Sequence, residues 1–236
     1  MASKTFVLVH GIWHGGWCWS RLAGILRARG HTVSTPTLTG LGERSHLLSR
    51  GITLTTFVTD IVNHLDWDDL RDVILVGHSF GGAPVTGAAD LRRDRIAQIV
   101  YLDGIMMEHG ETWFDLVSPE LAQSRQAQSE QSSGGLSLPV APVEKLGVTF
   151  PDDVAFLAPR LTPHPFATFT TALDLRHPIG NGLPCTYIRC TDPPYPPADI
   201  AFRRAQARGW PIHDIATGHD AMVTAPEALA EILEHL

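Results

Sequence analysis

Residues 77–81 read Gly-His-Ser-Phe-Gly, a Gly-x-Ser-x-Gly pattern that places Ser79 two residues from each glycine. The pattern follows the apolar run Val73–Val76, which predicts a buried strand, and precedes small residues that favour a helix to about Arg93. Glycines on both sides permit a strained strand-to-helix turn that exposes the serine hydroxyl. These features predict Ser79 as the nucleophile of an acyl-transfer reaction.

A serine hydroxyl attacks well only when a base takes its proton. Of the 12 histidines, His219 has the expected position, after the strand predicted at 210–215 and before a closing helix predicted at 226–236. His213 lies within that strand and is expected to pack or to face solvent. His10 is expected to brace the loop after the first strand, and His78 to pack beneath the serine turn. His219 is therefore the predicted base.

A carboxylate should orient the imidazole of this base. Asp192 follows the strand predicted at Cys185–Cys190, whereas Asp103 ends the strand predicted at Ile99–Leu102. Both positions lie at carboxyl ends of strands, where sites form in open parallel sheets. The sequence leaves both acids open, with a slight preference for Asp192. Asp220, next to the predicted base, is expected to have a surface or capping role.

The negative charge that develops on the carbonyl oxygen during acyl transfer requires preorganised N–H donors. The residue after the nucleophile, Phe80, should supply one backbone N–H group, and Ile12, in the loop after the first strand, the other. These two residues form the predicted oxyanion hole. Trp13 on the same loop, with Trp113 and Phe156 further along the chain, is expected to line the substrate pocket.

The elements that must position these residues alternate between strand and helix. Strands are predicted at 6–9, 33–36, 73–76 and 99–102, with helices at 17–29, at 55–65 with Thr55 as N-cap, and after residue 81. This alternation predicts a parallel sheet covered by helices on both faces. The stretch 105–182 interrupts the pattern and is predicted to be a mostly helical inserted cap with a flexible loop near Ser132–Leu138. The prediction is one domain, with a core over 1–104 and 183–236.

Composition narrows the classes of function. The 236 residues suffice for one core, and 44% hydrophobic and 18% charged residues indicate a folded globular chain. A net charge of −7 without a basic stripe or basic amphipathic helix argues against nucleic acid or membrane as partner. Metal-ligand spacings, dinucleotide motifs and phosphate-binding loops are absent, so we expect no metal and no cofactor. Three cysteines without a recognisable secretory leader predict reduced thiols in the cytoplasm, and the excess of arginine over lysine indicates a bacterial source.

Together with residues 10–17, His-Gly-Ile-Trp-His-Gly-Gly-Trp, the serine pattern gives the chain a family resemblance. It resembles the α/β-hydrolase superfamily, in particular the branch of plant methylesterases, hydroxynitrile lyases and small bacterial carboxylesterases. The resemblance is good over 5–104 and moderate over 184–236, while the cap matches only in length. It implies an α/β-hydrolase fold, a mostly parallel sheet flanked by helices, with a cofactor-free Ser-His-Asp site under an inserted helical cap.

Two positions bear on the chemistry within this branch. The lyases carry Thr directly after the first-strand His and Lys directly after the catalytic His, whereas this chain has Gly11 and Asp220 there. The resemblance therefore implies an esterase and not a lyase. The aromatic residues of the cap and Trp13 indicate that its substrates are small to medium, apolar or aromatic carboxylic esters. A lyase-like or biosynthetic tailoring enzyme and a non-catalytic binding protein are the alternatives, and amide, lactone or thioester cleavage and a homodimer stay open. The plant members place the acid slightly after the Asp192 position and lack an Asp at the position of Asp103, which also leaves the acid open.

Overall fold

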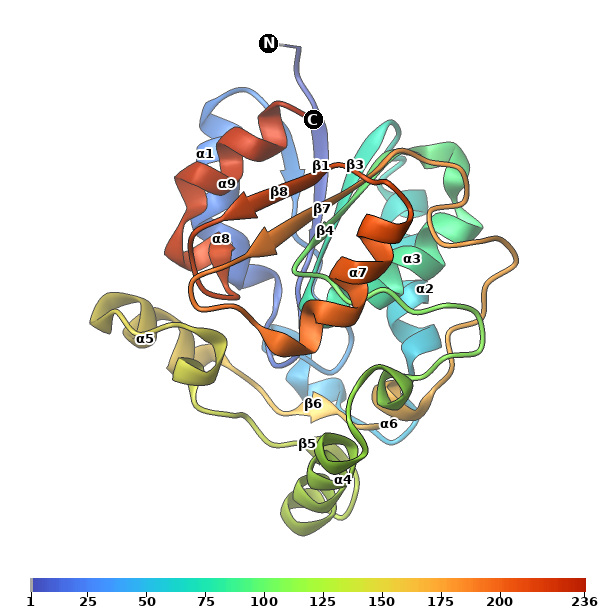
Figure 1. Cartoon of the computed structure of the whole chain (residues 1–236), viewed down its shortest axis with the longest axis vertical. Coiled ribbons are helices and arrows are strands. Elements are labelled where there is room, and N and C mark those ends of the chain that lie inside the picture. The colour runs from blue at the N-terminus through green and yellow to red at the C-terminus, as the bar shows by residue number, and fades with distance from the viewer. Residues whose placement is uncertain (1) are drawn as a thin grey trace.

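The computed structural model describes residues 2–236, which form a central six-stranded sheet flanked by helices (Figure 1). The strand order is β2-β1-β3-β4-β7-β8, and every neighbouring pair is parallel, as the sequence predicts. The sheet strands are β1 (Thr5–Val9), β2 (Thr32–Ser34), β3 (Val73–His78), β4 (Ile96–Leu102), β7 (Cys185–Cys190) and β8 (Ile212–Ile215). The helices are α1 (Ser20–Ala28), α2 (Leu54–Trp67), α3 (Gly82–Leu91), α4 (Pro119–Ser133), α5 (Pro151–Leu157), α6 (Ala167–Thr170), α7 (Asp199–Ala207), α8 (Ala221–Thr224) and α9 (Pro226–Glu234).

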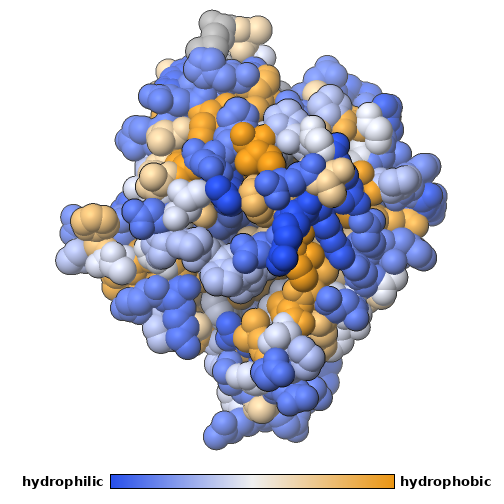
Figure 2. All heavy atoms as spheres, viewed as in Figure 1, coloured by the Kyte–Doolittle hydropathy of each residue, from blue (hydrophilic) through white to orange (hydrophobic). Residues whose placement is uncertain are grey.

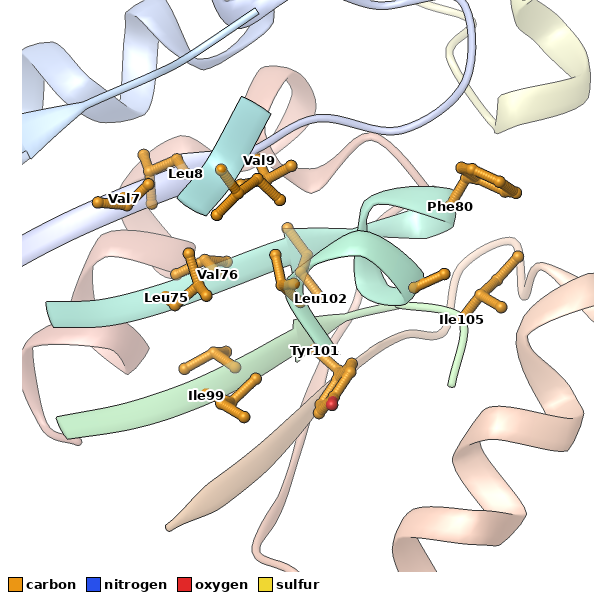
Figure 3. Packing of buried hydrophobic residues seen from close by; sticks show 14 of the residues in the cluster. Val7, Leu8, Val9, Leu75, Val76, Phe80, Ile99, Tyr101, Leu102 and Ile105 are labelled. Carbon is orange, nitrogen blue, oxygen red and sulfur yellow. The ribbon is translucent and has the colours of Figure 1, made fainter. Parts of the chain in front are cut away.

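The inner strands are apolar on both faces because helices cover both sides of the sheet. In β3 every residue is buried, and in β1 only the first residue is partly exposed. Val7, Leu75 and Ile99 come from three neighbouring strands and pack in the same apolar core (Figure 3). Continuous apolar runs of this kind are typical of strands in parallel sheets.

The covering helices show the patterns that burial demands. In Figure 1, α1, α8 and α9 lie on one side of the sheet, and α2, α3 and α7 on the other. Helix α2 buries one stripe and begins with a capping box in which Thr53 and Thr56 satisfy each other's backbone N–H groups. The predicted N-cap Thr55 is therefore wrong by two residues, because Thr53 is the last residue with extended backbone.

Residues 105–182, here named the cap segment, contain α4, α5 and α6, and these helices lie toward the lower end of the molecule in Figure 1. They also contain a small antiparallel sheet of β5 (Ser137–Leu138) and β6 (His164–Pro165), which the sequence did not predict. The stretch expected to be a flexible loop thus ends α4 and forms a strand. Among the described residues, the helices lack the length and apolar character that crossing a membrane requires.

The parallel sheet brings five loops together at one edge. Register pairs Val9 with Gly77, His78 with Leu102, and Cys190 with Ile215, so β1, β3, β4, β7 and β8 end close to one another. The residues that follow these strand ends include each predicted member of the catalytic set. The fold therefore gathers segments that are up to two hundred residues apart in the chain.

Candidate active site

Ser79 lies at a sharp turn between β3 and α3. Its φ is +53°, in the left-handed region that non-glycine residues rarely adopt, and it begins a 3-10 turn that leads directly into α3. Backbone strain of this kind concentrates at functional sites. The turn also places Ser79 at the N-terminal end of α3, where the helix dipole favours developing negative charge.

Glycines around this turn are required by close backbone approach. A Cβ on Gly81 would lie 2.6 Å from the carbonyl oxygen of His10, and one on Gly11 would lie 2.6 Å from the Cβ of Ser79. Neither position can hold a side chain without a shift of its neighbour. The loop after β1 and the serine turn are therefore packed directly against each other, as the glycine pattern predicts.

His219 follows β8 and is buried at the same edge of the sheet. Its Nδ1 lies 2.9 Å from Oδ2 of Asp103, which ends β4. A carboxylate only accepts hydrogen bonds, so Nδ1 carries the proton and Nε2 carries the lone pair. Nε2 is buried and has no hydrogen-bond partner among residues 2–236. The imidazole thus has the tautomer that a general base needs.

Asp103 is held by more than the histidine. Its Oδ1 accepts the backbone N–H of Cys190 at 3.0 Å, and its own N–H donates to the carbonyl of Ile188 at 2.7 Å. The residue is 1% exposed, and its backbone φ is +44°. Both carboxylate oxygens therefore face donors, and the aspartate is fixed by β7 and by His219 in the loop after β8.

Asp192 lies outside this set, which corrects the slight preference for it. Two residues beyond the end of β7, its backbone N–H donates to the carbonyl of Thr217 at 3.0 Å, while the residue itself is exposed. The chain has already turned toward solvent at this point. Of the two predicted acids, the structure brings Asp103 and not Asp192 to His219.

The predicted oxyanion residues Ile12 and Phe80 line the same small cavity as Ser79. The loop that carries Ile12 is braced by His10, as expected: its Nδ1 donates to the carbonyl of Gly11 at 2.8 Å, and its Nε2 accepts the N–H of Leu38 at 3.1 Å. Burial lowers the pKa of His10 to about 3, so this brace is a neutral imidazole at physiological pH.

Beneath the site lies a buried network that the sequence did not predict. His14 Nε2 donates to Asp220 Oδ2 at 3.1 Å, and His78 Nε2 donates to the backbone carbonyl of His219 at 3.0 Å. Burial alone would raise the pKa of Asp220, but the charge and hydrogen bond of His14 lower it to about 2. The expected surface role of Asp220 is wrong, because the residue is fully buried. It does occupy the N-cap position of α8, but its side chain makes no capping hydrogen bond and pairs with His14 instead.

The cavity at Ser79 is small and largely apolar. It measures about 20 Å3 and is lined by Ile12, Ser79, Phe80, Ile105, Trp113, Leu121, Arg125, Leu138, Phe169, Tyr195 and Pro197. The predicted pocket residue Trp113 is among them. Six of the lining residues come from the cap segment, so that segment covers the predicted nucleophile.

The other two predicted pocket residues lie elsewhere. Trp13 is buried beside the cavity, where its carbonyl accepts the N–H of Thr162 at 2.9 Å and ties the cap segment to the loop after β1. Phe156 packs edge-on against Trp17, at a ring distance of 5.7 Å, outside the cavity. Their positions depend on how the cap segment packs, which aromatic composition does not reveal.

Sequence reasoning missed Tyr195, which stacks on the imidazole of His219 with ring centroids 3.7 Å apart and planes inclined by 22°. It also lines a second cavity of about 190 Å3, between β7 and α7, that reaches Asp103. Tyr195 lies in a proline-rich loop, and the prolines indicate only that this loop is rigid, not that it reaches the site. Arg125 was missed as well, because it lies in a polar stretch with no catalytic pattern.

Three findings place the chain among known proteins. Residues 6–232 match the model of the Alpha/beta hydrolase family. The chain is 37% identical to the "Carbendazim hydrolyzing esterase" of Nocardioides sp. (strain SG-4G), over 98% of this chain and 99% of that protein. It is 41% identical to "Methylesterase 4" of Arabidopsis thaliana, over 44% of this chain and 40% of that protein. An extracellular alpha/beta-hydrolase from a Paenibacillus species superposes with a TM-score of 0.86 and 26% identity over 98% of both chains.

Proposed function

Because the chain belongs to the alpha/beta hydrolase family, we propose that this carboxylic ester hydrolase cleaves small to medium, apolar or aromatic esters through an acyl-enzyme on Ser79. The observation that carries the proposal is the buried pair of His219 and Asp103, 2.9 Å apart, at the strand ends beside the strained serine turn. The esterase relative that spans the whole chain supports the same reaction class.

The proposed reaction begins when Ser79 Oγ attacks the carbonyl carbon of the ester while Nε2 of His219 takes its proton. Asp103 holds the tautomer and stabilises the imidazolium that forms. The backbone N–H groups of Ile12 and Phe80 donate to the oxygen that becomes negative. The tetrahedral intermediate collapses, the alkoxide takes the proton from His219 and departs as the alcohol, and the acyl group stays on Ser79. Water then repeats the sequence and releases the acid.

The mechanism requires that the substrate reach Ser79, which the cavity as it stands does not allow. A cavity of about 20 Å3 has room for about one water molecule and none for an ester. Side chains of the cap segment must therefore move aside before substrate binds. Trp113, Leu121 and Phe169 are the apolar groups that the substrate would displace or contact, which supports an apolar substrate.

The experiment is hydrolysis of p-nitrophenyl acetate, butyrate and octanoate by the wild type, Ser79→Ala and the exposed control Ser49→Ala. We expect Ser79→Ala to lower kcat by about 10^4-fold or more and to lose labelling by a fluorophosphonate probe. Ser49→Ala should keep wild-type rates. A wild type that neither turns over nor labels would refute the proposal and favour the binding-protein alternative; cyanide release from a cyanohydrin would favour the lyase alternative.

The remaining expectations stay predictions. They are a cytoplasmic location, a bacterial source, a small-molecule ester as the partner without nucleic acid or membrane, and a homodimer as an open assembly. Among residues 2–236 no group of three His, Cys, Asp or Glu side chains has an arrangement that could hold a metal ion. All three cysteines are free and buried.

A further inference from the structure

One charged side chain lines the otherwise largely apolar cavity at Ser79. Arg125 projects from α4 of the cap segment, one helical turn beyond Leu121, which lines the same cavity. Its guanidinium lies 5.6 Å from the ring centre of Trp13. Figure 2 shows apolar residues in orange between the sheet-bearing part of the molecule and the α4 region, next to mostly polar surface.

Arg125 has no carboxylate partner among residues 2–236. Its hydrogen bond is a long one of 3.3 Å to the amide oxygen of Gln128. By contrast, Arg204 donates two hydrogen bonds to the carboxylate of Glu111, and Arg92 forms an ion pair with the carboxylate of Asp66. Arg125 is partly exposed, so its guanidinium is available to an anionic group that enters the cavity.

The nearby acidic groups do not fill this role. Asp103 is engaged by His219 and by a backbone N–H group, and Asp220 is engaged by His14. Burial raises the pKa of Tyr195 to about 12, against the opposing charge of Arg125, so its phenol is neutral at physiological pH. The five N–H donors of the guanidinium are suited to a planar, two-oxygen acceptor.

We propose that Arg125 binds a free carboxylate on the substrate, so that the preferred substrate is an ester with an apolar or aromatic body and a second, anionic end. The aromatic rings of Trp113 and Phe169 would contact the body, while Ser79 attacks the ester. This inference rests on the proposed function and assigns the substrate class of the same site.

The test compares two pairs of esters that differ in charge but little in shape. Monomethyl terephthalate and methyl 4-carbamoylbenzoate carry the group on the acid side, and 4-acetoxybenzoate and 4-acetoxybenzamide carry it on the alcohol side. Wild type is compared with Arg125→Gln, Arg125→Lys and the control Arg160→Gln, an arginine of the cap segment that stacks on Phe156 outside the cavity.

We expect the wild type to prefer the anionic member of one pair. Arg125→Gln should lower kcat/KM for that anionic ester by about 10- to 100-fold, which is the range expected for loss of a charge-assisted hydrogen bond. The neutral member should change by less than about twofold. Arg125→Lys should keep part of the preference, added salt should reduce it, and Arg160→Gln should match wild type.

The outcomes separate this inference from the function on which it rests. Equal losses on charged and neutral esters, or no loss with Arg125→Gln, would overturn the inference while leaving the esterase intact, and thermal unfolding would show whether the variant is folded. A wild type that cleaves no ester and takes no fluorophosphonate label would overturn both. Whichever pair shows the preference identifies the side of the ester that carries the carboxylate.

Discussion

Replacing Asp103 by Asn tests the catalytic geometry most directly. The two oxygens of Asp103 accept two N–H groups, from Nδ1 of His219 at 2.9 Å and from the backbone of Cys190 at 3.0 Å. An amide offers one oxygen and one NH2 group, so it can accept only one of these donors. The other donor then meets the NH2 group, and either His219 or the backbone must give way.

The two orientations of the amide have different costs. If NH2 faces His219, Nδ1 must accept, Nε2 carries the proton, and the imidazole cannot act as a base; loss of the correct tautomer costs about 10^4-fold in kcat. If NH2 faces Cys190, a buried N–H group is left without an acceptor, at a cost of about 1–3 kcal/mol in stability. We expect the orientation with NH2 facing His219 to determine the measured rate, so that kcat of Asp103→Asn falls by between about 10^2- and 10^4-fold.

The assay is p-nitrophenyl butyrate hydrolysis under saturating substrate, with Asp192→Asn as the matched control and circular dichroism as a check of folding. Asp192 is exposed and its side chain makes no hydrogen bond in the described part of the chain, so Asp192→Asn should keep kcat within about twofold. A folded Asp103→Asn enzyme with near wild-type kcat, or a large loss with Asp192→Asn alone, would refute this assignment of the acid.

Two further changes probe the packing around the site. Gly11→Ala places a Cβ 2.6 Å from the Cβ of Ser79, the proposed nucleophile, so we expect kcat to fall by at least about tenfold in a folded protein. An unchanged kcat would show that the loop after β1 shifts without cost. Burial alone would lower the pKa of His14, but the charge and hydrogen bond of Asp220 raise it overall. The pair therefore stabilises the fold most between about pH 4 and 6.5, where Asp220 is ionised and His14 is protonated. This contribution is lost as the pH rises through the raised pKa of His14. Urea unfolding should therefore show a larger difference between wild type and His14→Gln at pH 5.5 than at pH 8.5, and a constant difference would contradict the pairing.

The features that could be predicted from the sequence have local signals. Ser79 stands between a fully buried strand and a helix of small residues, and the glycines beside it mark a turn that other residues cannot form. His219 was singled out because it follows the last strand, and parallel strands bring such loops to one edge. The sheet itself follows from apolar runs that alternate with amphipathic helices.

Of the expected pocket residues only Trp113 lines the cavity, because the rest of the lining depends on packing between distant segments. Arg125 and Trp13 are more than a hundred residues apart, and nothing in either tract indicates that the guanidinium would lie over the ring. Phe156 was expected in the pocket on composition alone, yet α5 carries it to Trp17. The short β5–β6 pairing likewise consists of two residues on each side, too few for a pattern of alternation.

The ambiguity over the acid has a physical origin in the sheet. Strand β4 lies between β3 and β7, and register pairs Leu102 with both His78 and Ile188, so Asp103 at its end is next to the serine strand on one side and to β7 on the other. An acid at the end of either β4 or β7 could approach a histidine from the loop after β8. What selects Asp103 is its left-handed backbone, with φ of +44°, together with the Cys190 N–H group that fixes its second oxygen. Both depend on three-dimensional register, which a single sequence does not reveal.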